Sequence, residues 1–75
     1  MAAGETFLAM IDKGFELDQM QATNAWSMIS YFAANKKDAE LLARAIEEFK
    51  KAAQDGRYRD ANLKRMEKAL KKLKS

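Results

Sequence analysis

Residues 38–56 read DAELLARAIEEFKKAAQDG and carry the clearest folding signal in the chain. Apolar side chains recur there three and four positions apart, which places them along one face of a helix. They are Leu41, Leu42, Ala45, Ile46, Phe49, Ala52 and Ala53. Charged side chains between Glu40 and Lys51 fall on the opposite face, and the pair Asp55-Gly56 is typical of a helix end. The stretch predicts an amphipathic helix over about 38–54.

The preceding segment has an equally specific start signal. Asp18 followed by Gln21 fits a capping box, with Leu17 and Ala22 placed as a hydrophobic staple around it. A helix from there to about residue 34 has one broad apolar stripe, formed by Ala22, Ala25, Trp26, Met28, Ile29, Phe32 and Ala33. Either Asn35 or Asp38 is able to cap the helix that follows.

Two further helices are expected at the ends of the chain. A short one covers about 4–13, because Gly14 stands where a left-handed helix end is wanted. The last begins between Arg57 and Ala61, depending on whether Asp60 is its cap, and continues to about residue 74. Its narrower apolar stripe consists of Leu63, Met66, Leu70 and Leu73.

The composition supports helices throughout. Proline and valine are absent, while alanine, lysine, glutamate, leucine and methionine dominate. These are the strongest helix formers, and strand-forming β-branched residues are scarce. We therefore expect one all-α domain over residues 1–75, a compact antiparallel helical bundle of three main helices plus a short N-terminal helix. Short connections make successive helices antiparallel neighbours.

The side chains offer little catalytic chemistry. The chain has no histidine and no cysteine, which removes the usual general base and the commonest metal ligands. Glu47 and Glu48 are the only adjacent acidic pair, and neighbours on a helix point about 100° apart, so they do not converge on one site. We expect no enzyme, no catalytic residues, no metal and no cofactor.

The sequence also gives expectations about where in the cell the protein is located. No run of about 18 apolar residues is present, so we expect no membrane-spanning helix. The first residues lack the charged and then apolar pattern of an export signal, which favours the cytoplasm.

Charge is distributed unevenly along the chain. Residues 1–49 carry four basic and eight acidic side chains, whereas residues 50–75 carry ten basic and three acidic ones. A basic face of this kind predicts binding of nucleic acid or another polyanion. The candidate residues are Arg57, Arg59, Lys64, Arg65, Lys68, Lys71 and Lys72. The alternative is a solubilising lysine-rich face whose charge complements the helix dipole.

A second candidate surface is apolar and lies on the helix after Asp18. Met20 and Tyr31 fall outside its main stripe, and Trp26 and Met28 flank the edges. Aromatic residues and methionine are frequent anchors of protein–protein contacts. The alternative is that the short first helix and residues 15–17 cover that side.

The leading interpretation is a small non-enzymatic interaction protein, acting as an adaptor, inhibitor or regulatory subunit. It would bind a partner protein through Met20, Trp26, Met28 and Tyr31, with a homodimer as one form of that contact. The alternative function is binding of a nucleic acid or another polyanion through the basic last helix.

Overall fold

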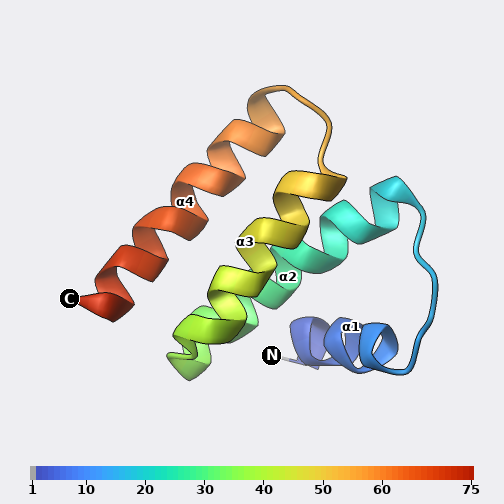
Figure 1. The fold of residues 1–75 in the computed structure, drawn as a ribbon, viewed down its shortest axis with the longest axis horizontal. Coiled ribbons are helices and arrows are strands. Elements are labelled where there is room, and N and C mark those ends of the chain that lie inside the picture. Colours follow the sequence, from blue (N-terminus) through green and yellow to red (C-terminus); the bar gives the residue numbers. More distant parts are fainter. Residues whose placement is uncertain (1) are drawn as a thin grey trace.

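The computed structural model describes residues 2–75, with side chains from Gly4 onward, and this part of the chain forms four helices. They are α1 (Ala2–Asp12), α2 (Gln19–Lys36), α3 (Ala39–Ala52) and α4 (Arg57–Lys74). Figure 1 shows that α2, α3 and α4 run alternately up and down, with α4 at the outer edge beside α3. The predicted bundle of three long helices and a shorter N-terminal one is confirmed.

The capping box at the start of α2 is present as predicted. Asp18 Oδ1 accepts a hydrogen bond of 2.8 Å from the Gln21 backbone N–H, and Gln21 Oε1 accepts one of 3.1 Å from the Asp18 N–H. Two of the orphan N–H groups of the helix start are thereby satisfied. These two hydrogen bonds fix the start of α2 at this position.

The junction between α2 and α3 is decided by Asp38. Its Oδ1 accepts a hydrogen bond of 3.0 Å from the Leu41 N–H, so Asp38 is the N-cap of α3. Asn35 lies inside α2, which extends to Lys36, beyond the predicted end near residue 34. The helix ends there because Lys37 adopts a left-handed conformation, with φ of 58°.

The α3–α4 connection also differs slightly from the expectation. α3 ends at Ala52, and Ala53 is its cap in an extended conformation. α4 begins at Arg57, at the early limit of the predicted range, with Gly56 as its N-cap. Asp60 lies in the first turn of α4 and does not cap it.

The core lies between α2, α3 and α4. Its largest fully buried apolar side chains are Phe49, Ile29, Leu42 and Met66. The apolar face predicted for α3 is the one that is buried, through Leu42, Ala45, Ile46 and Phe49. α1 adds Phe7, Leu8 and Ile11 to the edge of this core as half-buried side chains. Burying such side chains is worth about 1.5–3 kcal/mol each, which identifies apolar packing as the main stabilising term.

Close approach of α1 to α2 depends on Gly4. A Cβ at this position would lie 2.5 Å from the Met28 carbonyl oxygen and 2.6 Å from Phe32 Cβ. Only glycine leaves room for the two helices at this distance. The short α1 is therefore held against α2 by a contact between backbones.

A ladder of polar side chains joins α2 to α4. Tyr58 donates to Asn24 Oδ1 at 3.3 Å, and Ser27 donates to Asn62 Oδ1 at 3.0 Å. Further along, Arg65 donates to Ser30 Oγ at 3.1 Å. The two helices run in the same direction (Figure 1), so these three pairs follow one another in register. We call them the polar ladder.

Candidate interaction surfaces

The exposed face of α2 is free of charge. From Gln19 to Asn35 the helix has no charged side chain, although a third of the whole chain is charged. Several of its side chains are nevertheless exposed to solvent, namely Met20, Gln21, Asn24, Met28, Tyr31 and Asn35. Met20 is 75% exposed, Met28 45% and Tyr31 51%. We call these exposed residues the uncharged α2 face.

Trp26 does not belong to this surface, which corrects its assignment from the sequence. Only 6% of its surface is exposed, and it packs in the core cluster with Ile29 and Ile46. The guanidinium of Arg44, in α3, lies over the Trp26 ring at 5.2 Å from the centroid. Trp26 is buried because its side of α2 faces α3, a direction that the helical periodicity of α2 alone does not give.

The neighbouring segments cover the uncharged α2 face only in part. α1 packs against the Met28 backbone through Gly4, yet the Met28 side chain remains nearly half exposed. Phe15, in the α1–α2 connection, is itself exposed. The expectation that α1 and residues 15–17 bury this side therefore does not hold for Met20, Met28 and Tyr31.

The basic residues of α4 fall into two groups. Arg57, Lys64, Lys68, Lys71 and Lys72 are exposed, and none of them forms an ion pair with any carboxylate among residues 4–75. Arg59 and Arg65 are half-buried. Arg65 donates to Ser30 Oγ and Asn62 Oδ1, both at 3.1 Å, so its guanidinium belongs to the polar ladder.

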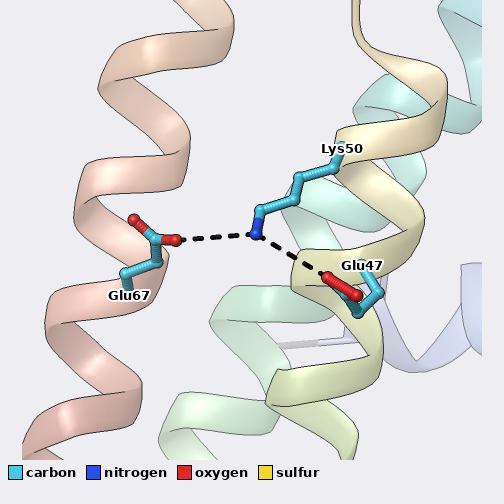
Figure 2. Close-up of polar contacts among 3 residues, drawn as sticks. All are labelled: Glu47, Lys50 and Glu67. Carbon is cyan, nitrogen blue, oxygen red and sulfur yellow. Dashed lines mark ion pairs between the residues drawn. The ribbon is translucent and has the colours of Figure 1, made fainter.

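Three glutamates of α3 and α4 are instead paired with lysines of α3. Figure 2 shows Lys50 between Glu47 of its own helix and Glu67 of α4, with N–O distances of 3.7 and 3.8 Å. Lys51 pairs with Glu48 at 4.0 Å. Glu67, the one acidic residue in the second half of α4, is thus directed toward α3. No carboxylate among residues 4–75 lies within ion-pair distance of Lys64, Lys68, Lys71 or Lys72.

Lys37 extends the basic surface and was missed in the sequence. It lines a hollow of about 460 Å³ together with Lys72, and Ala34, Ala69 and Leu73 form the rest of the wall. The hollow lies where the end of α2 meets the last turns of α4. A lysine between two helices is an ordinary surface residue in the sequence pattern, so only the tertiary structure places it beside Lys72.

No metal site is assembled in the described part of the chain. Among residues 4–75, no group of three or more acidic side chains is positioned to hold a metal ion. None of the described helices is both long enough and apolar enough to cross a membrane. Comparison with known protein families, with curated proteins and with solved structures finds no match for the chain.

Proposed function

We propose that this chain is a small, non-enzymatic cytosolic interaction protein that binds a partner protein through the uncharged α2 face. The observation that carries the proposal is the exposure of Met20, Met28 and Tyr31 on a helix face without charge. Interface centres are depleted of charged residues and enriched in tyrosine and methionine. A surface that only kept the protein soluble would be expected to carry charges, as the outer face of α4 does.

The composition of this face also indicates the kind of partner. Asn24, Gln21 and Asn35 alternate with the apolar side chains, and their amides both donate and accept hydrogen bonds. A partner surface that is apolar at its centre and polar without charge at its rim would leave no charge buried and unpaired. A second copy of the chain satisfies this condition through the same face.

The test introduces charge into the face without touching the core. The double variant Met20→Lys/Met28→Lys should keep the helical circular dichroism of the parent, because both side chains are exposed. Light scattering after size exclusion measures self-association, and photo-crosslinking from position 31 measures contact with a partner from the native source. We expect the double variant to lose both self-association and the crosslink to a partner.

A matched control adds a lysine elsewhere on the surface. Ala9→Lys changes an exposed residue of α1 and should retain association and crosslinking. Crosslinking from position 51, on the exposed side of α3, should give no product. A parent chain that stays strictly monomeric and yields no crosslink from position 31 would contradict the proposal.

A second candidate function is supported by the unpaired lysines of α4. Four exposed lysines, Lys64, Lys68, Lys71 and Lys72, lack a carboxylate partner among residues 4–75, while Lys50 and Lys51 of α3 are paired. Unpaired cations on one helix favour a polyanion, whose bound counterions are released on binding. Binding to a DNA duplex that weakens steeply with salt would support this function, and absence of binding at low salt would exclude it.

A further inference from the structure

Two helix ends in this chain have the same hydrogen-bond pattern but different residues at the decisive position. At the end of α1, the Gly14 N–H bonds to Ile11 O at 3.0 Å and the Phe15 N–H to Met10 O at 3.1 Å. At the end of α2, the Lys37 N–H bonds to Ala34 O at 3.1 Å and the Asp38 N–H to Ala33 O at 2.9 Å. Both ends are Schellman motifs.

The residue at the left-handed position differs between the two ends. Gly14 has φ of 90° and Lys37 has φ of 58°. Glycine adopts this conformation without penalty, whereas the Cβ of any other L-residue crowds the following carbonyl oxygen. A lysine therefore stands at a position where glycine would be more favourable for the fold. Strained positions of this kind are a reason to look for a functional role.

The surroundings of Lys37 indicate such a role. Lys37 and Lys72 line the same hollow at the end of α2. On α4, Lys64, Lys68 and Lys72 follow at intervals of four residues, about 6 Å apart along the helix axis. All four lysines are exposed, and none is ion-paired within residues 4–75. We call Lys37, Lys64, Lys68 and Lys72 the lysine strip.

We propose that the lysine strip binds the phosphate backbone of a nucleic-acid duplex without reading its sequence. This inference rests on the second candidate function and adds Lys37 to its site. Lysine ammonium groups spaced along a line neutralise successive phosphates as point charges. The strip contains no asparagine or glutamine, which read adenine, and no arginine, whose planar fork contacts guanine at two points.

The polar side chains of α4 that face α2 are bonded within the protein, and one face of the Tyr31 ring is covered, which favours a duplex over a single strand. Asn62 is bonded to Ser27, and Arg65 to Ser30 and Asn62. One face of the Tyr31 ring is covered by the Arg65 guanidinium at 3.8 Å, so a base cannot stack on that face. Single-strand binding relies on such open aromatic faces.

The variant Lys37→Gly separates folding from binding. Glycine relieves the left-handed position, so the midpoint of thermal unfolding should stay equal or rise. Loss of one phosphate contact should lower the affinity for duplex DNA about eightfold at about 100 mM salt, and the salt slope should become less steep by about 0.9. Fluorescence anisotropy with duplexes of two unrelated sequences measures both quantities.

Companion variants isolate the charge. Lys37→Arg should retain affinity, and Lys37→Asn, which also tolerates the left-handed region, should lose as much as Lys37→Gly. The double reversal Lys68→Glu/Lys72→Glu should abolish binding. Lys13→Glu/Lys51→Glu changes the net charge equally at exposed sites away from the strip, and should lower affinity far less.

The outcomes distinguish this site from the broader polyanion function. If Lys68→Glu/Lys72→Glu abolishes duplex binding while Lys37→Gly leaves it unchanged, the polyanion function stands and the lysine strip is overturned. If the parent chain binds no duplex DNA or RNA at about 50 mM salt, both fail. Tighter binding to single strands, polyglutamate or phosphatidylserine vesicles than to a duplex also overturns the assignment.

Discussion

The guanidinium of Arg65, in α4, lies over the ring of Tyr31, in α2, with 3.8 Å between the guanidinium carbon and the ring centroid. Tyr31 belongs to the uncharged α2 face, and Arg65 was predicted to serve the basic surface. The two candidate surfaces therefore share an edge at this pair. Arg65 acts there as part of the packing between helices, because it also bonds Ser30 and Asn62.

Truncation of Arg65 should weaken the fold. Arg65→Ala removes two hydrogen bonds and a cation–π contact, and we expect the free energy of unfolding to fall by about 2 kcal/mol. Arg65→Lys keeps the charge but not the fork of donors and should lose about half as much. Urea unfolding followed by circular dichroism measures both values. Equal stability of the parent and Arg65→Ala would show that the ladder contributes nothing at this rung.

Gly4→Ala should disturb the contact between α1 and α2. Alanine favours the helix by about 1 kcal/mol, but the new Cβ would press on the Met28 carbonyl and Phe32, and overpacking costs about 1–3 kcal/mol. The cost of overpacking exceeds the gain in helix propensity. Amide hydrogen exchange in α1 should therefore accelerate, while the amides of α3 remain protected. The control is Gly14→Ala, which meets no atom within 4 Å and should act only through its positive φ. Unchanged exchange in α1 of Gly4→Ala would contradict the close approach.

Replacement of Lys50 should have a small effect. Lys50→Met breaks the pairs with Glu47 and Glu67, and exposed pairs of this kind contribute about 0.2–1 kcal/mol. The difference from the parent should shrink in about 1 M salt, where screening is nearly complete. Denaturant midpoints at low and high salt provide the measurement. A loss above about 2 kcal/mol would mean that the triad matters more to the α3–α4 contact than its exposure indicates.

The two aspartate caps should be separable by experiment. Asp18→Ala and Asp38→Ala each remove a side-chain acceptor from a helix start, and we expect each to lower stability by about 1 kcal/mol. The caps share no partner, so the double variant should show the sum of the two losses. Asn35→Ala serves as the control, because Asn35 lies within α2 and caps nothing. If Asn35→Ala lowered stability as much as the two aspartate variants, Asn35 and not Asp38 would be the cap of α3.

The fold could be predicted because its signals are local. Capping at Asp18 and the apolar face of α3 depend on residues a few positions apart, and both appear as expected. Trp26 and Arg65 could not be placed, since each lies near the border of a helix stripe and its burial depends on which neighbour packs there. Periodicity gives the angle of a side chain around its own helix, but not the position of the next helix.

Lys37 shows a different limit of the sequence. A glycine marks the end of α1 and can be recognised, whereas a lysine in the same backbone conformation has no sequence signature. Its proximity to Lys72 depends on the α2–α4 contact, which joins residues about 35 positions apart. The candidate sites were therefore predicted residue by residue, while their arrangement required the tertiary structure.

The polar ladder has a geometric consequence beyond stability. Its rungs join Asn24 with Tyr58, Ser27 with Asn62 and Ser30 with Arg65. The rungs repeat about once per helical turn, so a shift of α4 by half a turn, about 2.7 Å, would break all three. A shift by a full turn could pair at most two rungs again and would leave the residues at the two ends of the ladder without partners. The ladder therefore favours one axial alignment of the two helices, in which all three hydrogen-bonded pairs form. Because Lys37 follows α2, the polar ladder also sets the distance between Lys37 and each lysine of α4.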